Sequence, residues 1–432
     1  MNLEVTNIGK ISHANIELNS ITVIAGENNT GKSTIGKMLF CVFHAFHGIE
    51  EQVVAERVKS IARILRGYLY ESYSGRFLQP KVIMRLAENI VNRKEAVLAD
   101  MNVLAREIVA FLQSIDLRSQ QHISIENLET LEPLYAKICV YLTIEDDDLR
   151  KAILRKRLEA EFAMKIGHLN HPDKESRVGV HIKDSSIEFT VIKNENIDIK
   201  SYMSLNKEII YMDDPFILDD INDSRWDVFL NKFGHRHDML EKLADGKKTT
   251  EFTMADELVV KKKLEKIFDI MSGVCSGSVT EDESGNFIYQ TDRLQGNLEM
   301  INLSTGMKSF AILRRLLENG NIDEKGVVIL DEPEIHLHPE WQLRFAEIIV
   351  LIQKEFDVNI LLNTHSPYFL NAIEVYSEKY GIDQKCKYYL VDEKEGSTAV
   401  TDVTDKTEII YAKLARPLQE LENLEYSDEG TV

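Results

Sequence analysis

Apolar residues follow two different spacings along the chain. Short β-branched runs such as ITVIA at 21–25 are typical of buried strands, and beyond residue 309 strand and helix patterns alternate as far as CKYYLVDE at 386–393. Strands that alternate with helices indicate a parallel sheet, so the spacing predicts an α/β fold. Strands are expected at 2–7, 14–25, 178–200, 207–215 and 285–292.

Helical spacing dominates two long segments. Between about 49 and 170, glycine and proline are rare, apolar residues recur every three or four positions, and no heptad repeat is sustained. The clearest helix there is expected at 145–166, where three acids from Asp146 onward favour a helix amino end. Residues 222–272, including the stretch WDVFLNKF, are also predicted to be helical. The last sixteen residues carry five acids and no base, which predicts a mobile tail.

These patterns predict one discontinuous core with helical parts inserted into it. The core is expected to comprise residues 1–48, 171–221 and 273–405. The remaining parts are a helical insertion at 49–170, a helical subdomain at 222–272, and a C-terminal helix and acidic tail at 406–432.

The charge balance narrows the range of partners. The 432 residues include 51 Lys and Arg against 71 Asp and Glu, a formal net charge of −20. Phosphate binding draws its affinity from Lys and Arg, so a chain this acidic is not expected to hold nucleic acid over its whole surface. Basic runs at 150–157 and 261–263 leave a local basic face open, although such runs are ordinarily solvated helix faces.

The sequence also predicts the compartment. The first ten residues have no apolar signal core, and no run approaches the roughly 18 apolar residues that a membrane span needs. The cysteines show no CxxC and no metal-like spacing, which predicts free thiols in a reducing cytosol. We therefore expect a soluble cytoplasmic protein. The cysteines are Cys41, Cys139, Cys275 and Cys386.

The segment GENNTGKST at 26–34 carries a phosphate-binding motif. It matches G-x-x-x-x-G-K-[ST] and lies between a predicted strand and a predicted helix, the context that the motif requires. Gly26 and Gly31 allow backbone geometries that turn N–H groups toward a phosphate. Lys32 would reach the outer phosphates, and Ser33 would place its hydroxyl on Mg²⁺, so ATP and Mg²⁺ are the predicted ligands. The remaining loop positions counted in the site are Asn28, Asn29, Thr30 and Thr34.

Two further motifs follow apolar strands. GVVILDEPE at 326–334 places Asp331 where it would hold Mg²⁺ through water, and Glu332 where a base would polarise an attacking water. In NTHSP at 363–367, His365 comes just past a strand, where a neutral imidazole would bond the terminal phosphate or that water. Alone, an acidic pair after a strand is as often a cap or turn, and a lone histidine is usually structural. The phosphate loop at the same sheet edge favours the functional interpretation.

The stretch INLSTGMKSF at 301–310 is a weaker signal. Its S-x-G turn before a helix can present N–H groups and a hydroxyl to an anion. Ser304 or Thr305 would equally serve as an ordinary helix cap, and the two roles are compatible because a cap can also face a phosphate.

The order of the four motifs resembles that of the ABC-type ATPases, including their SMC and DNA-repair branch, over about 2–47 and 285–393. LSTGMK stands where those proteins carry LSGGQ. DEPEIHLHPEWQ and THSP look closest to stand-alone ATPases that include the OLD family and the ATPase subunits of the Septu and PARIS anti-phage systems. The resemblance implies a mixed, mainly parallel sheet with an antiparallel β subdomain. It also implies a head-to-tail dimer, or a higher oligomer, in which Ser304 and Gly306 touch the partner's ATP.

The sequence departs from that family in places. Asp213 and Asp214 follow the strand after which the family usually has a glutamine that couples Mg²⁺ to partner movement. LSTGMK lacks one glycine and the final glutamine of LSGGQ. His336 and His338 suggest a zinc pair, but a contact near the dimer seam fits the resemblance better.

The leading hypothesis is an ATPase whose nucleotide-driven dimer controls a separate effector. Only residues 394–432 follow LVDE, so an appended nuclease is not expected. The resemblance implies anti-phage defence with a partner such as a TOPRIM or HNH nuclease. One alternative is an SMC or repair-type DNA-associated ATPase, which would need long coiled arms or a strong basic face. The other is an ATP-stabilised scaffold with little turnover, against which Lys32, Glu332 and His365 argue.

Overall fold

The computed structural model divides the chain into two compact units. One unit comprises Met1–His47 with Leu154–Val432, and the other comprises Gly48–Ile153. The structure describes residues 1–72, 79–115, 131–163, 165–223, 226, 230–245, 254–292, 296–322, 324–394 and 396–428.

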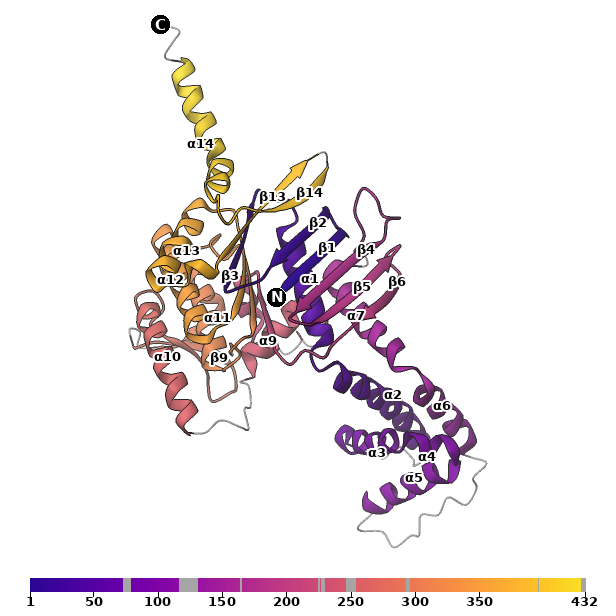
Figure 1. Cartoon of the computed structure of the whole chain (residues 1–432). Coiled ribbons are helices and arrows are strands. Elements are labelled where there is room, and N and C mark those ends of the chain that lie inside the picture. Colours follow the sequence, from indigo (N-terminus) through magenta and orange to yellow (C-terminus); the bar gives the residue numbers. More distant parts are fainter. Residues whose placement is uncertain are drawn as a thin grey trace. The chain divides into compact units, whose positions relative to one another are not determined.

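An 11-stranded mixed sheet organises the larger unit, in the order β6-β5-β4-β1-β2-β14-β13-β3-β12-β11-β7 (Figure 1). The strands β13, β3, β12, β11 and β7 run parallel to one another, and those from β6 to β2 form an antiparallel section. Between the two sections, β14 runs antiparallel to β13 and parallel to β2. The bounds are β1 (Asn2–Ile8), β2 (Ile11–Glu17), β3 (Ile21–Gly26), β4 (Ser176–Ile182), β5 (Ser185–Ile192), β6 (Asn196–Ser201), β7 (Ile209–Met212), β11 (Val327–Asp331), β12 (Asn359–Thr364), β13 (Lys387–Lys394) and β14 (Ser397–Asp402).

Helices cover both faces of the parallel section. Alternate strand residues point to opposite faces, and every residue of β3 and β11 is buried. A Cβ on Gly36 of α1 (Lys32–Phe46) would lie 3.0 Å from the Tyr211 ring and 3.1 Å from Ile329, so α1 packs closely on one face. Val328 and Leu330 instead share a core with α11 (Thr305–Glu318), α12 (Pro339–Phe356) and α13 (Pro367–Tyr380). Figure 1 shows these three helices on the side of β3 away from α1.

A smaller antiparallel sheet and further helices complete this unit. The small sheet has the order β10-β9-β8, and α11 contacts β8. Its strands and the remaining helices are β8 (Ser278–Glu281), β9 (Phe287–Gln290), β10 (Leu298–Glu299), α9 (His235–Ala244), α10 (Met254–Ser272) and α14 (Glu408–Asp428), with 3₁₀ turns at Pro215–Asp220, Met300–Asn302 and Asp383–Lys385.

The unit Gly48–Ile153 is helical and has its own apolar core, in which Ile61, Leu65 and Ile138 are fully buried. The buried guanidinium of Arg57 donates to the carbonyls of Tyr141 and Leu142 and so satisfies the carboxyl end of α6. The helices are α2 (Ile49–Ser72), α3 (Pro80–Asn92), α4 (Lys94–Ala99), α5 (Met101–Ile115), α6 (Glu132–Thr143) and the first part of α7 (Asp146–Phe162).

The predicted α/β class, with a mixed sheet and helical insertions, is confirmed. The chain remains helical to Asp428, further than the predicted tail allowed, and residues 429–432 lie outside the described part. Within WDVFLNKF, residues 227–229 lie outside the described part, and residues 230–233 form a bend and a turn before α9, so the helix predicted there is wrong for these four residues. Among the described residues, no helix is long and apolar enough to cross a membrane.

Candidate active site

The phosphate-binding motif forms a tight loop between β3 and α1. Asn29 and Gly31 have positive φ angles of 64° and 99°, which turn the chain back toward the start of α1. A Cβ on Gly26 would lie only 2.6 Å from the carbonyl oxygen of Val391 on β13, so glycine is required for this close approach. These geometries make a tight turn at the carboxyl end of β3, and phosphate binding by the N–H groups of the loop stays a prediction.

Lys32 is buried within this loop, with 3% of its surface exposed. Its Nζ donates to the carbonyl oxygens of Gly26 and Glu27, both at 2.8 Å, and lies 3.3 Å from the carboxylate of Glu332. The loop carbonyls therefore hold the Lys32 ammonium group beside Glu332, which follows β11.

Asp331 ends β11 and has both carboxylate oxygens engaged. The Tyr211 hydroxyl donates to one oxygen at 2.7 Å, and the Asn363 amide donates to the other at 2.9 Å. Asp331 and Asn363 are register partners on the parallel strands β11 and β12, so the strand alignment fixes this contact. Sequence analysis missed both donors. Asn363 could have been found from the sequence, because GVVILD and NILLNT both read as apolar strands and carry Asp331 and Asn363 near their carboxyl ends.

Glu332 and His365 form a pair beside Lys32. Glu332 has a φ of 50°, and its carboxylate lies 3.4 Å from Nδ1 of His365. Contact with His365, together with the charge of Lys32, lowers the pKa of Glu332. Contact with Glu332 raises the pKa of His365 and outweighs the effect of burial. The contact thus makes the ring easier to protonate than a free histidine, and the predicted role of a neutral imidazole stays a prediction.

Glu334 is a further residue that the sequence analysis did not single out. Its side chain is 2% exposed, and Oε1 accepts hydrogen bonds from the Thr364 hydroxyl at 2.5 Å and the His365 N–H at 3.2 Å. Burial raises the pKa of Glu334 despite these hydrogen bonds. Through these hydrogen bonds, Glu334 links the turn that contains DEPE to the turn that contains THSP.

The donor set suits Mg²⁺. This ion prefers hard oxygen ligands and is usually held by one or two carboxylates together with substrate phosphates. Asp331 retains lone pairs beyond the two hydrogen bonds it accepts, and Ser33 lies exposed in the first turn of α1. In the described part of the chain no group of three or more His, Cys, Asp or Glu is arranged as a metal cage. Asp331 and Ser33 are hard oxygen donors of the kind that hold Mg²⁺ together with phosphates.

The LSTGMK turn caps α11. Ser304 is exposed, and its hydroxyl accepts from the Met307 N–H at 3.4 Å, so the predicted cap is present. A Cβ on Gly306 would lie 3.0 Å from the Trp341 ring and 3.1 Å from the carbonyl oxygen of His336. Close packing therefore accounts for this glycine. Within the described residues no hydrogen bond or ion pair joins Ser304 to the phosphate loop of its own chain.

The residues in place of the family's glutamine are held by ion pairs. Asp213 contacts Nε2 of His235 at 2.9 Å, and the other ring nitrogen contacts Glu161 of α7 at 2.8 Å. Asp214 accepts from the Phe216 N–H and pairs with Arg236 at 2.6 Å. The sequence singled out Asp213 and Asp214 but not these partners.

His336 and His338 have separate roles in the fold. The His336 ring packs edge-on against Phe216, with centroids 5.6 Å apart. His338 caps α12, since its Nδ1 accepts from the Glu340 N–H. Neither contact is a metal contact.

Fold and motifs together define a P-loop ATPase of the AAA type. The family model described as "AAA domain, putative AbiEii toxin, Type IV TA system" matches residues 21–371, and the chain belongs to this family. The predicted resemblance is confirmed at this level.

Curated relatives match shorter stretches. Septu protein PtuA of Bacillus thuringiensis is 27% identical over 202 residues, which cover 43% of this chain and 48% of that protein. The "Retron Ec83 probable ATPase" of Escherichia coli is 35% identical over 94 residues, covering 19% of this chain and 17% of that protein. The chain thus matches about half or less of the length of these relatives. The solved SMC head domain from Thermotoga maritima aligns with a TM-score of 0.39 and 10% identity, covering 93% of this chain and 98% of that chain.

Proposed function

We propose that the chain binds and hydrolyses ATP at the carboxyl edge of the sheet and uses its ATP-bound form to control a separate effector in anti-phage defence. The observation that carries the proposal is the convergence of Lys32 and His365 on Glu332, 3.3 and 3.4 Å away, at the mouth of a P-loop. An ammonium group and an imidazole around one carboxylate beside a phosphate-binding loop form a preorganised site for charge that moves during phosphoryl transfer.

Each residue has a distinct role in this proposal. Lys32 and the loop N–H groups bind the outer phosphates, and Ser33 with Asp331 holds Mg²⁺, which supplies charge neutralisation on those phosphates. Glu332 stays ionised because its pKa is lowered, so its carboxylate accepts a hydrogen bond from the attacking water. His365 orients Glu332 and faces the terminal phosphate.

Dimerisation belongs to the same proposal. Ser304 is an exposed cap at the amino end of α11, where the helix dipole and the hydroxyl would stabilise an anion from another molecule. A head-to-tail dimer would bring this turn to the ATP on the partner's phosphate loop.

The defence role rests on the relatives. Septu protein PtuA and the retron Ec83 ATPase match this chain in sequence and carry the names of anti-phage systems, and their likeness supports a similar place for this protein. We therefore propose a separate effector, with a TOPRIM or HNH nuclease as the kind of partner, located in the cytoplasm.

The test is a comparison of Glu332→Gln with Glu340→Gln. Glu340 is exposed on the neighbouring α12 and lies outside the site, so it is a matched control. Glu332→Gln should slow phosphate release from Mg-ATP by about 10²–10⁴-fold, because the amide accepts no proton from water. ATP binding should persist, and light scattering during size exclusion should detect an ATP-dependent dimer. Turnover within a few-fold of wild type would exclude Glu332 as the base.

A further inference from the structure

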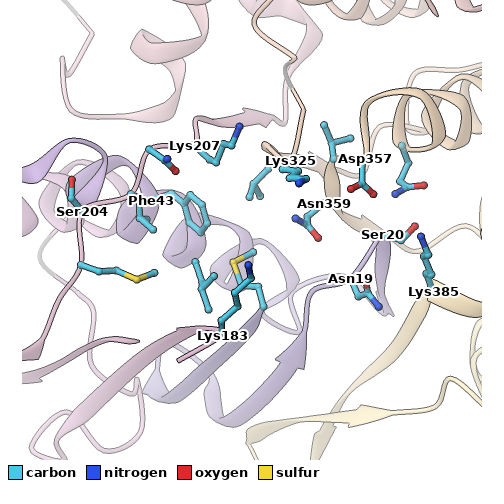
Figure 2. Close-up of a pocket in the computed structure, with 18 residues that line it drawn as sticks. Asn19, Ser20, Phe43, Lys183, Ser204, Lys207, Lys325, Asp357, Asn359 and Lys385 are labelled. Atoms are coloured by element: carbon cyan, nitrogen blue, oxygen red, sulfur yellow. The ribbon is translucent and has the colours of Figure 1, made fainter. Parts of the chain in front are cut away.

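A second cavity lies at the opposite edge of the sheet from the phosphate loop. It has a volume of about 740 Å³ and is bordered by the segments that precede β3, β7, β11, β12 and β13 (Figure 2). Asn19 and Ser20 line it just before β3, and Asn359 lines it at the start of β12. The ATPase motifs follow the carboxyl ends of these strands, so this cavity is separate from them. Its volume lies within the range of small-molecule sites.

Four lysines converge on this cavity from four different segments. Lys183 comes from the turn between β4 and β5, Lys207 precedes β7, Lys325 precedes β11, and Lys385 precedes β13. Asp357 is the single acid among the 18 residues that line the cavity in the described structure. The surrounding chain has a formal net charge of −20, so the cavity is a local positive site on an acidic protein.

The chain leaves these ammonium groups available. Within the described residues, none of the four forms an ion pair with a carboxylate, and Lys207 donates only to the backbone carbonyl of Glu324 at 2.8 Å. The Glu324 carboxylate pairs instead with Lys263 at 2.9 Å. The Glu324 carboxylate also interacts with Lys207 and Lys325 through space. The four ammonium groups still outnumber the nearby carboxylates of Glu324 and Asp357, and this excess of positive charge favours an anionic ligand, particularly one with several negative oxygens.

The remaining lining residues give the cavity an apolar part and several amide groups. Phe43, Met203 and Leu205 supply the apolar surface, and Asn19, Asn206 and Asn359 supply the amides. The cavity therefore offers a charged part and an uncharged part to one ligand.

We propose that this cavity is a second anion site that takes a phosphate-bearing ligand the size of a nucleotide. The lysines would neutralise the phosphate, and the apolar surface would cover the uncharged part of the ligand. A simple carboxylate would leave most of the four ammonium groups without counterions. The same phosphate chemistry is offered by a free nucleotide and by a nucleotide within a nucleic-acid strand.

The experiment measures binding of three probes to the full chain by calorimetry and fluorescence anisotropy. The probes are AMP, inorganic pyrophosphate and a short single-stranded oligonucleotide. Lys183→Glu combined with Lys325→Glu removes positive charge from the cavity at two exposed positions, and Lys261→Glu combined with Lys262→Glu is the control with an equal charge change on an exposed part of α10. Lys32→Ala is measured in parallel to separate binding at the phosphate loop.

The cavity variant should lose at least about tenfold in affinity for the bound probe, while the control and Lys32→Ala retain it. Binding of AMP or pyrophosphate, but not the oligonucleotide, assigns the site to a free nucleotide. Oligonucleotide binding that AMP competes away assigns it to a nucleic-acid strand. The proposal is overturned if no probe shows saturable binding, or if the two double variants lose affinity equally. Thermal midpoints and ATP binding check that the variants are folded.

Discussion

At the scale of residues, the site is organised by carboxylates in three different environments. Asp331 accepts two neutral hydrogen bonds, Glu332 lies between Lys32 and His365, and Glu334 is buried and accepts from the THSP turn. These surroundings lower the pKa of Glu332 and raise that of Glu334. The two carboxylates of one short motif are thus suited to different tasks. Glu332 faces the proposed site of hydrolysis, and Glu334 holds the THSP turn in place.

Glu334 should act as a positioning residue for His365. Glu334→Ala removes the acceptor for both Thr364 and the His365 N–H, so His365 should shift and kcat for ATP should fall by about 100-fold. Glu334→Gln keeps an amide oxygen for the same donors and should recover most of kcat. The KM for ATP should stay within a few-fold in both variants, because Lys32 and the loop are untouched.

The pH profile separates positioning from simple loss of structure. Glu334 lies 3.8 Å from His365, and its charge contributes to the raised pKa of that ring. The Gln variant removes this contribution, so the limb of the kcat profile that reports His365 should move to lower pH. A profile that does not move, together with equal losses in the Ala and Gln variants, would contradict the assignment.

The role of a residue could be predicted from the sequence only where that residue belongs to a recognisable motif. Lys32, Asp331, Glu332 and His365 stand in recognisable local patterns next to strand ends. Tyr211 lies 120 positions from Asp331, and its role depends on β7 pairing beside β11. His235 likewise meets Asp213 and Glu161 only through tertiary packing. No local pattern reports such contacts. The predictions for Ser304 and Gly306 at a partner's ATP remain predictions.

At the scale of elements, His235 links α9 to α7 through Glu161 and to the end of β7 through Asp213. Burial disfavours its charge, but hydrogen bonds and charges from Asp213 and Glu161 outweigh this and raise its pKa to about 9. An ordinary histidine pKa is about 6.5. Folding therefore favours the protonated ring, and the resulting stability is fully present below pH ~6.5 and is lost as pH rises through about 9.

His235→Gln should therefore destabilise the protein more at pH 6 than at pH 10. The gap in unfolding free energy between wild type and variant should shrink by on the order of 2–3 kcal/mol over this range. Urea midpoints followed by circular dichroism measure it. Asp213→Asn should lower the His235 pKa and move the change to lower pH. A gap that is constant with pH would show that His235 is not charged in the folded protein.

The helical unit Gly48–Ile153 is the element expected to recruit the effector. It has an independent core, so replacing 49–152 with a short glycine-serine linker should spare the ATPase core and ATP binding. This deletion is shorter than the predicted insertion of 49–170, because Glu161 of α7 contacts His235 in the ATPase unit and has to be kept. Affinity capture from the native host should lose the effector. Retained capture would move the docking surface to the ATPase unit.

Element types followed from spacing because the core strands are short apolar runs and the helices are amphipathic. ITVIA and VVIL became β3 and β11, and the acidic start near Asp146 became the first turn of α7. The order of the 11 strands was not readable from the sequence, since β3 lies between β12 and β13, which are more than 300 residues away in the chain. Long-range pairing of this kind is set by the whole core.

At the scale of the whole molecule, the question is whether one chain completes the other's site. Ser304→Arg would place a bulky cation at the exposed cap of α11 without entering its own phosphate loop, and Lys32→Ala would remove phosphate binding from that loop. Either homodimer should fail to close around ATP, because every site then contains a lesion. In a mixed dimer with head-to-tail sites, both lesions fall in one site. The other site combines an intact Lys32 with an intact Ser304.

The mixed dimer should therefore regain ATP-dependent closure at one of its two sites. Differently tagged chains purified in tandem verify the pairing, and a distance-sensitive fluorophore pair on the two chains measures closure without requiring turnover. A control mixture in which one chain carries both Lys32→Ala and Ser304→Arg and the other is wild type should contain no intact site, since each trans site then receives one lesion. Closure by that control in place of the first mixture would instead show that Ser304 acts on the ATP of its own chain.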